Sequence, residues 1–398
     1  MKGSAELRMP PAVFYGRGSF AKVGEQAVCL GKKALLISDR VMERNGHVAR
    51  CRQYLDRAGV SHVSYLDIHS EPTDRYVGEA LKRLQEEQCD VIVALGGGSC
   101  LDTAKAVAVV AANGGYIGDY TGGKKRIERD PIPLIAVPTT AGTGSEVTSV
   151  TVITNTKDDV KMMIKHPAFV PAVAIVDPVL TVSCPPKVTA ATGLDALCHA
   201  VEAYISRRSH PLTDTLALSA VERIVPNIRK AYENRENLDA RENMALAAMQ
   251  AGVAFSNASV CLVHGMSRPI GALFHVPHGV SNAMLLPAVL EFTRPACVPR
   301  LAVIGRIIDR CLEGRSDEEA AEGAISKIKG LCSALDIPNM KAWGIKREKL
   351  ENALDKMAAD ALDSGSPEMN PRIPTHGEIV ELYRYCYDYS FSNMECTH

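Results

Sequence analysis

The sequence predicts an N-terminal α/β domain with a parallel sheet, followed by a C-terminal domain built entirely from α-helices. In the first half of the chain, short apolar runs rich in β-branched residues alternate with segments of helical period. This alternation is typical of a parallel sheet that is covered by helices on both faces. After Pro185–Pro186 nearly every segment has helical period, and no β-branched run remains. We place the boundary near Thr181–Lys187, so that residues 1–184 form the first domain and residues 185–398 the second.

The individual elements follow from the same patterns. The runs KALLIS and DVIVAL are apolar on both faces, whereas the helix expected at 73–88 gathers Val77, Ala80, Leu81 and Leu84 on one side. The expected strands of the first domain are 33–38, 61–68, 90–95, 134–137 and 173–176, and its expected helices are 41–59, 73–88 and 101–112. The expected helices of the second domain are 189–206, 214–233, 239–256, 318–335 and 347–362.

Composition excludes several classes of partner. The 398 residues carry a formal net charge of −1, so the chain has no basic surface of the kind that binds nucleic acid or an anionic membrane. The sequence contains no run of 18 uncharged apolar residues, so it predicts no membrane-spanning helix. Its first residues lack the apolar core of a signal peptide. The 12 cysteines are scattered without a CxxC pair, which predicts reduced thiols and a cytoplasmic protein.

A glycine-rich turn follows the expected strand 90–95 directly. Gly96, Gly97 and Gly98 precede Ser99 and then a small, apolar helix. Glycines let the backbone approach a ligand closely, and the free N–H groups at a helix N-terminus favour a phosphate. The turn therefore predicts a pyrophosphate site, although a tight strand-to-helix turn without a ligand would show the same sequence. The pattern GxxxxGK[ST] is absent, which argues against a kinase or ATPase.

Two other polar features also follow strands of the first domain. Asp39 ends the expected strand 33–38, where a carboxylate can accept hydrogen bonds from a ribose diol and favours NAD over NADP. Capping of the following helix would explain the same residue. The loop Pro138–Thr148 holds five hydroxyl side chains, which could bind phosphate, ribose or amide groups or simply form a polar loop. Ligands bind at this edge of open α/β sheets.

Histidines cluster in the segment Val263–Asn282. His264 and His278 are each followed by glycine, and the segments on either side are apolar. Imidazole is costly to bury unless each ring nitrogen finds a partner. Two such pairs in one buried-looking segment therefore indicate a bound metal whose other ligands come from elsewhere in the chain.

The expected helix 189–206 offers those ligands. Asp195 and His199 are four residues apart and so share one face, among small and apolar neighbours. An Asp–His hydrogen-bonded pair would explain this helix alone. With His264 and His278 added, one carboxylate and three imidazoles suit Fe²⁺ or Zn²⁺ with an open position for substrate. Cys198 and Cys261 lie nearby and are either further ligands or structural cysteines.

Together these motifs resemble the iron-containing (group III) alcohol dehydrogenases, which have the dehydroquinate-synthase-like fold. The resemblance covers nearly the whole chain, and its marks occur in the family's order. They are FYGRG at 14–18, GGGSCLDTAK at 96–105, PTTAGTGSEVT at 138–148, Lys161, DPVL at 177–180, TGLDALCHAVEAY at 192–204, HGMSRPIGALFHVPHGVSNAMLLP at 264–287 and NPRIPT at 370–375.

The resemblance implies a homodimer or larger homo-oligomer that transfers hydride between a primary alcohol and NAD(H). It implies a metal, usually Fe²⁺ and sometimes Zn²⁺, bound by Asp195, His199, His264 and His278. The residues that it places along the dinucleotide are Asp39, Gly97, Gly98, Ser99, Asp102, Thr139, Thr140, Thr143, Thr148, Val152, Lys161 and Leu180.

The chain departs from the family pattern at two positions. Glu71 stands where the family usually has asparagine beside the cofactor, and Arg268 stands where it often has a second histidine, four residues after His264. Arginine stays protonated and cannot accept the substrate proton, so we expect that proton to leave through water or His275. Arg268 could instead pair with a carboxylate or sulfonate on the substrate, as in an ω-hydroxy acid, or serve as a structural ion-pair partner in the second domain.

Two other functions fit the fold. One is a dehydroquinate-synthase-type lyase that uses NAD transiently beside Zn²⁺, although the segment 264–279 matches the dehydrogenases better. The other is a non-catalytic nucleotide-binding or assembly module. The Asp/His₃ set argues against such a module, because the cluster would be costly to bury without its cation.

Overall fold

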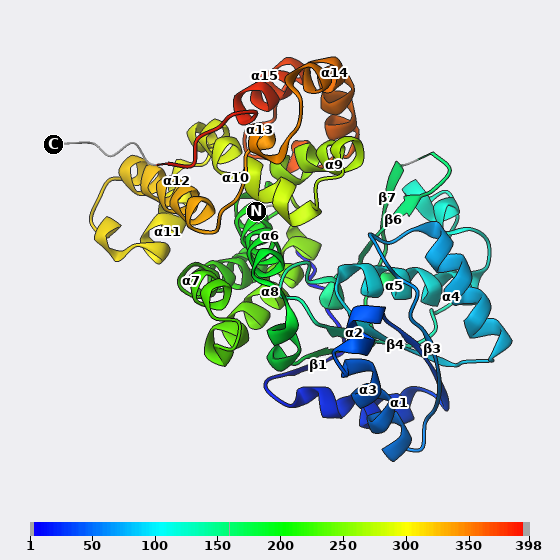
Figure 1. The fold of residues 1–398 in the computed structure, drawn as a ribbon. Coiled ribbons are helices and arrows are strands. Elements are labelled where there is room, and N and C mark those ends of the chain that lie inside the picture. Colours follow the sequence, from blue (N-terminus) through cyan, green and yellow to red (C-terminus); the bar gives the residue numbers. More distant parts are fainter. Residues whose placement is uncertain (1–3, 159, 393–398) are drawn as a thin grey trace. The chain divides into compact units, whose positions relative to one another are not determined.

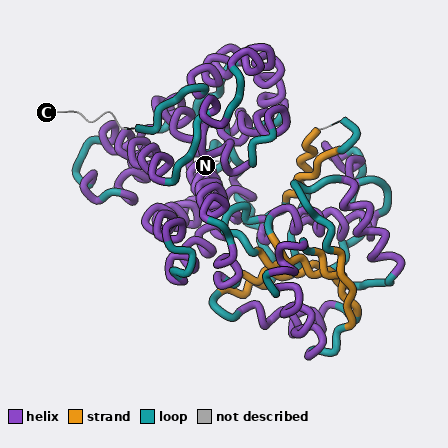
Figure 2. The backbone as a smooth tube through the Cα atoms, viewed as in Figure 1, coloured by secondary structure: helices purple, strands orange, loops and turns teal. Residues whose placement is uncertain are grey.

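The structure is a computed structural model that describes residues 4–158 and 160–392. It divides into two compact units (Figure 1). The first, Arg8–Cys184, is called the α/β unit below. The second, called the helical unit, comprises Pro185–His398 together with Met1–Leu7. All strands of the described residues lie in the α/β unit (Figure 2). The predicted fold class is therefore confirmed.

The α/β unit is built on a six-stranded sheet in the order β1-β8-β5-β4-β2-β3, and every neighbouring pair in it is parallel. Its strands are β1 (Ala12–Tyr15), β2 (Lys33–Ile37), β3 (Ser61–Tyr65), β4 (Val91–Gly96), β5 (Leu134–Pro138) and β8 (Val173–Val176). A separate antiparallel hairpin consists of β6 (Val150–Asn155) and β7 (Val160–Lys165). The helices are α1 (Lys22–Leu30), α2 (Arg40–Arg44), α3 (His47–Arg57), α4 (Asp74–Glu86) and α5 (Gly98–Asn113).

Alternation along the central strands produces two cores, one on each face of the sheet. Leu35 and Ile92 point to the face that packs against α4 and α5. Leu36 and Val93 point to the opposite face, which packs against α1 and α3. Successive side chains on a strand face opposite sides, so strands buried on both faces must be apolar throughout, as KALLI and VIVALG are.

The expected helix 41–59 is wrong in one respect, since two helices occupy the segment. Gly46 lies between α2 and α3 with φ of 78°, a left-handed conformation that glycine adopts without steric cost. The strand β1 and the hairpin β6–β7 were not predicted. β1 is only half-buried at the edge of the sheet and has no continuous apolar run.

The helical unit contains no strand among its described residues. Its longer helices are α6 (Pro186–Ile205), α7 (Pro211–Glu233), α8 (Leu238–Ala258), α9 (Leu262–Phe274), α10 (His278–Thr293), α11 (Val298–Ile308), α12 (Asp317–Ala334), α14 (Arg347–Asp363) and α15 (His376–Cys386), with the short α13 (Met340–Trp343) before α14. Across residues 4–158 and 160–392, no single helix has the length and apolar composition needed to cross a membrane. α8 and α9 meet those criteria only as a pair, with a bend of 103° between them.

Candidate metal centre and dinucleotide-binding edge

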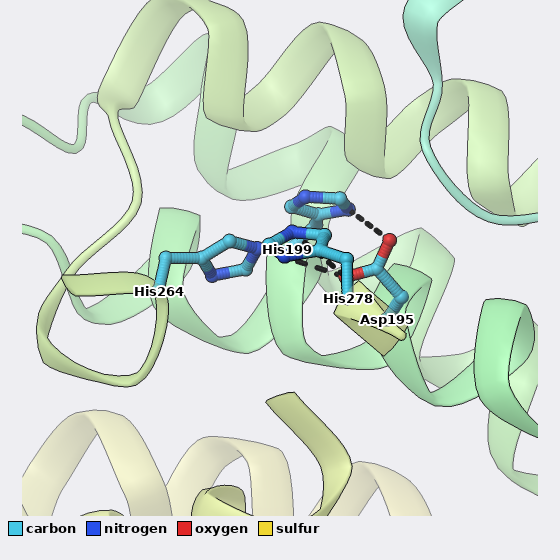
Figure 3. Close-up of side chains that lie close together, drawn as sticks. All are labelled: Asp195, His199, His264 and His278. Carbon is cyan, nitrogen blue, oxygen red and sulfur yellow. Dashed lines mark ion pairs between the residues drawn. The ribbon is translucent and has the colours of Figure 1, made fainter. Parts of the chain in front are cut away.

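Three helices of the helical unit bring one carboxylate and three imidazoles together. Asp195 and His199 come from α6, His264 from the first turn of α9, and His278 from the first residue of α10. Each side chain offers one possible ligand atom, and these atoms all lie within 4.8 Å of one another (Figure 3). The sequence prediction named these four residues, and the structure gathers them into one cluster.

The spacing of the cluster suits a small divalent cation. Oδ1 of Asp195 lies 3.7 Å from Nε2 of His264 and 3.8 Å from Nε2 of His278. Oδ2 of Asp195 lies 4.0 Å from Nδ1 of His199. Ligand atoms about 2.1 Å from a tetrahedral metal would stand about 3.4 Å apart, so these three distances would have to shorten by about 0.3–0.6 Å.

Burial makes the charges of the cluster strongly interdependent. Asp195 and His264 are almost completely buried, whereas the side chain of His278 is 38% exposed. Burial acts to raise the pKa of Asp195, but the three histidines outweigh it and hold that pKa well below its usual range. Burial likewise acts to lower the pKa of His264, and the carboxylates of Glu202 and Asp195 outweigh it, raising the pKa to about 9.

The amide of Asn282 shows where the lone pairs of the cluster converge. Its Nδ2 lies 2.6 Å from Oδ1 of Asp195 and 3.1 Å from Nε2 of both His264 and His278. An amide nitrogen carries two hydrogens, so it cannot serve three acceptors at once. Its own Oδ1 is buried and has no hydrogen-bond partner among the described residues. The donor set is therefore incompletely satisfied by protein groups alone, as expected of residues that fit a cation.

The glycine after each of two cluster histidines has a packing role. A Cβ on Gly279 would stand 2.4 Å from the backbone oxygen of Ala191 in α6, and a Cβ on Gly265 would stand 2.9 Å from Pro367. Only glycine permits these approaches. Gly279 thus lets the start of α10, with His278, come against the helix that carries Asp195.

Glu202, which the sequence patterns did not single out, contacts the cluster from its outer side. It lies three residues after His199 on α6 and is 1% exposed. Its Oε2 lies 2.6 Å from Nδ1 of His264, and its Oε1 accepts the N–H of Val263 at 2.6 Å. The spacing from Asp195 of seven residues, two helical turns, was the signal that could have identified it.

The two candidate catalytic residues lie outside the four-residue cluster. Arg268 follows His264 by one turn of α9, and its Nη2 donates to Oγ of Ser366 at 3.2 Å. Burial lowers the pKa of Arg268, and the charge of Glu202 opposes that effect. His275 is exposed and ends α9 in a left-handed conformation with φ of 53°.

In the α/β unit, the predicted glycine turn joins β4 to α5 and lies against the neighbouring loop. A Cβ on Gly98 would stand 2.9 Å from the side chain of Thr143, and one on Gly97 would lie 3.6 Å from Thr140. The N–H of Thr139 donates to the carbonyl of Gly96 at 3.0 Å. The carboxyl ends of β4 and β5 thus bring the two predicted ligand-binding loops together.

In the part of the chain that the structure describes, the start of α5 has no side-chain cap, which it shares with α1 and α3 but not with α2 and α4. Asp39 caps α2 through its side chain, and Thr73 caps α4. The residue before α5 is Gly97, and no side chain caps the helix among the described residues. Its first N–H groups and the positive end of its dipole thus remain available to an anion, which suits a pyrophosphate.

Asp39 caps α2, which is one of its two sequence interpretations. Its Oδ1 accepts the N–H groups of Val41 and Met42 at 2.7 and 2.9 Å, as a helix cap does. Its Oδ2 lies 3.6 Å from Sγ of Cys100, beside the glycine turn. The predicted contact with a ribose diol stays a prediction.

Several predicted cofactor residues are engaged within the protein. Asp102 accepts Oγ of Ser145 at 2.5 Å and the N–H of Val152 at 2.8 Å, so its carboxylate fastens two following segments to α5. The hydroxyl of Thr148 lies 2.9 Å from Nζ of Lys105, a buried lysine that also donates to the carbonyls of Thr148 and Val150. Both residues shape the edge rather than offering free side chains to it.

Lys105 was not singled out in the sequence, although it lies in the glycine motif. Burial lowers its pKa to about 8, against the raising effect of Asp102 and Glu146. Burial raises the pKa of the enclosed Glu146 to about 7, against the lowering effects of its own backbone and of Lys105. A lysine three residues after an aspartate on an apolar helix was the available signal.

The other predicted cofactor residues lie in three different surroundings. Lys161 lies on β7 and forms an ion pair with Glu71, the residue at which the chain departs from the family pattern. Leu180 is fully buried in the core beneath the sheet, so only its backbone could face a ligand. Ser99 is half-buried in the first turn of α5.

Comparison with known proteins identifies the family. A family model described as iron-containing alcohol dehydrogenase matches residues 10–178, and the model for the C-terminal region of the same family matches residues 189–387. The chain is 38% identical to the NAD-dependent methanol dehydrogenase of Bacillus methanolicus, over 94% of this chain and 98% of that protein.

Comparison with solved structures supports the same family. A 1,3-propanediol oxidoreductase superposes with a TM-score of 0.93 and 38% identity, over 97% of this chain and 100% of that one. A sulfoacetaldehyde reductase from Bifidobacterium kashiwanohense, solved with NAD⁺, superposes with a TM-score of 0.87 and 27% identity, over 98% and 100%. The chain belongs to the iron-containing alcohol dehydrogenase family, and it is an alcohol oxidoreductase.

We predict that Gly98→Ala weakens NADH binding about tenfold or more, because the new Cβ would push Thr143 out of the loop beside α5. Isothermal titration calorimetry with NADH measures the effect. Gly78→Ala is the matched control, since Gly78 lies inside α4 and a Cβ added there would meet nothing within 4 Å. That control should leave NADH affinity unchanged and add about 0.5–1 kcal/mol of stability. Equal NADH affinity in both variants would contradict the assignment of the glycine turn.

Proposed function

We propose that this alcohol oxidoreductase is an NAD(H)-dependent, iron-loaded enzyme that interconverts primary alcohols and aldehydes. The observation that carries the proposal is the convergence of Asp195, His199, His264 and His278 within 4.8 Å. These four residues would hold the metal. When bound, Fe²⁺ or Zn²⁺ would supply Lewis acidity at the alcohol or carbonyl oxygen, and the nicotinamide would accept or donate the hydride.

The choice of NAD over NADP rests on the α/β unit. Asp39 places a carboxylate beside the glycine turn, where it would favour a ribose diol and repel a 2′-phosphate. The uncapped start of α5 would bind the pyrophosphate. Lys161, held by Glu71, would reach the dinucleotide from the β6–β7 hairpin. The relative from Bacillus methanolicus is NAD-dependent by name, which supports the same choice.

We also infer that the protein works as a homodimer or larger homo-oligomer in the cytoplasm. The family resemblance supports the first inference. Every cysteine in the described part of the chain is a free thiol, which supports a reducing compartment.

Reconstitution tests the proposal against the lyase and the non-catalytic module. We expect the protein loaded with Fe²⁺, and to a lesser degree with Zn²⁺, to consume NADH in the presence of short aldehydes, as followed by NADH absorbance. A chelator should abolish that consumption. His264→Ala should lower it at least about tenfold, because one of the four donors is removed and even the loss of an outer-shell partner costs about 10- to 100-fold.

The control for this experiment is His376→Ala, which removes an exposed histidine of the same unit. It should retain both metal content and activity. A loaded wild-type protein that consumes no NADH with any aldehyde would favour the lyase or the assembly module over the dehydrogenase.

Arg268 bears on whether the substrate carries an anionic group away from its reacting carbon. It lies one turn beyond His264 on α9, so a carboxylate or sulfonate on the substrate would find a guanidinium near the metal ligands. The sulfoacetaldehyde reductase, whose structure is similar to this chain, is named for an anionic aldehyde. The contact with Ser366 and the influence of Glu202 favour instead a structural role within the helical unit.

Substrate comparison separates these two interpretations. If Arg268 binds an anionic group, kcat/KM for succinic semialdehyde should exceed that for butanal. Arg268→Met should then lower the first value by about 10- to 100-fold and leave the second nearly unchanged, since a hydrogen bond to a charged group contributes about 1.5–3 kcal/mol. Arg229→Met removes an exposed arginine of α7 as the control. A wild-type preference for butanal would leave Arg268 with the structural role.

His275 is our candidate for passing the substrate proton to solvent, because it is exposed and Arg268 cannot accept a proton. We predict that His275→Asn alters the pH–rate profile of alcohol oxidation. Asparagine suits this position because it tolerates the left-handed conformation that His275 adopts. His376→Ala should keep the wild-type profile. A profile unchanged in His275→Asn would exclude His275 and leave a water-mediated route.

A further inference from the structure

Glu202 is a buried carboxylate that the roles assigned so far do not use. It is 1% exposed, lies on α6 two turns after Asp195, and has both carboxylate oxygens engaged by the first turn of α9. Oε1 accepts the N–H of Val263 at 2.6 Å, and Oε2 lies 2.6 Å from Nδ1 of His264. One side chain therefore holds both the backbone and the ring of the segment that carries a cluster histidine.

The contact with the ring determines where its protons lie. An ionised carboxylate only accepts hydrogen bonds, so Nδ1 of His264 must carry the hydrogen that it shares with Oε2. In the neutral ring, Nε2 then carries a lone pair. This nitrogen faces Asp195 Oδ1 at 3.7 Å and Asn282 Nδ2 at 3.1 Å, inside the cluster. A carboxylate behind a ligating histidine fixes its tautomer and orientation and makes it a stronger donor.

We propose that Glu202 is the positioning residue of the metal centre, which holds His264 in the tautomer that presents Nε2 to the metal. The proposal rests on the proposed function, since it needs a metal at the four-residue cluster. It also explains how α9 begins, because Cys261, the residue before the helix, provides no side-chain cap and Glu202 of α6 binds the N–H of Val263 instead. A negative charge at a helix N-terminus is itself favourable.

A competing arrangement uses the same atoms. Cys198, Glu202 and Nδ1 of His264 also lie within 4.8 Å of one another and could hold an ion of their own. Sγ of Cys198 is 3.8 Å from Nδ1 of His264, farther than Oε2 of Glu202. The short contact of 2.6 Å fits a shared hydrogen rather than two ligands separated by a cation. We therefore expect one metal per chain, with Glu202 outside its coordination sphere.

Glu202→Gln is the sharpest substitution because it keeps the size of the side chain. A carboxylate accepts two hydrogen bonds at once, whereas a carboxamide has one accepting oxygen and one donating NH₂. If the oxygen serves Val263, the NH₂ faces Nδ1 and favours the tautomer with hydrogen on Nε2. If the oxygen serves Nδ1, the NH₂ opposes the N–H of Val263. Either arrangement sacrifices a contact that the wild-type protein makes.

The experiment measures Co²⁺ binding by chelator competition, together with the visible absorption spectrum of the Co²⁺-loaded protein. We expect Glu202→Gln to bind Co²⁺ about 10- to 100-fold more weakly, with an altered spectrum, and to retain wild-type NADH affinity. Cys198→Ala should keep the wild-type Co²⁺ affinity and spectrum. Wild-type affinity and spectrum in Glu202→Gln would overturn the proposal and leave Glu202 as a helix cap. Two equivalents of Co²⁺ per wild-type chain, with one lost in Cys198→Ala, would overturn it in favour of a second ion.

A second measurement needs no variant and so does not depend on folding of Glu202→Gln. In the Zn²⁺-loaded wild-type protein, ¹⁵N NMR of the labelled histidine rings should show His264 with hydrogen on Nδ1 and metal on Nε2. The opposite tautomer, with Nδ1 on the metal, would overturn the proposal. If the wild-type protein binds neither Co²⁺ nor Zn²⁺ at the cluster, the proposed function itself fails, which is distinct from normal binding that is insensitive to Glu202.

Discussion

The buried carboxylate of Asp195 sets the constraint that the helical unit must satisfy. A single ionised carboxylate in an apolar interior is costly unless opposite charge or donors surround it. The amide of Asn282 meets part of that need, and a cation held by Asp195 and the three imidazoles would meet the rest. These side chains come from three helices that must pack closely at one point. Gly279 makes this packing possible, because any side chain there would collide with the backbone of α6 at Ala191. The close packing around Asp195 thus requires glycine at position 279, far along the chain.

In the α/β unit, buried polar side chains hold neighbouring segments in place. The backbone N–H groups at the start of α5 are left for a ligand. Asp102 and Lys105 are turned inward, where they fasten the loop of Ser145 and the hairpin strand β6 to α5. Their burial is costly, as the shifted pKa of Lys105, about 8, indicates. What this arrangement leaves open is the glycine-rich start of α5, which no side chain caps in the described part of the chain. A rigid frame and an uncapped helix start suit a ligand that is bound mainly through its phosphates.

Sequence patterns predicted the parts of this structure that depend on local rules. The apolar strands and the long amphipathic helices follow from period and length, and the four-residue spacing of Asp195 and His199 places them on one face. What the patterns missed depends on distant partners. β1 gains its place by pairing with β8, far along the chain, and carries no apolar run of its own. Glu202 was overlooked because a glutamate on a helix is usually solvent-exposed, and only the fold brings α9 onto it.

His264 lies between two carboxylates, which face its two ring nitrogens. Glu202 accepts on the Nδ1 side at 2.6 Å, and Asp195 lies 3.7 Å from Nε2. Burial alone would strip the ring of its charge, yet the two carboxylates outweigh it and raise the pKa of His264 to about 9. The two carboxylates thus favour positive charge at this ring. Glu202 would keep the hydrogen on Nδ1, while Nε2 would stay open to a cation. Asp195 would bind the cation directly and Glu202 would orient the ring, so a change at either carboxylate should weaken metal binding.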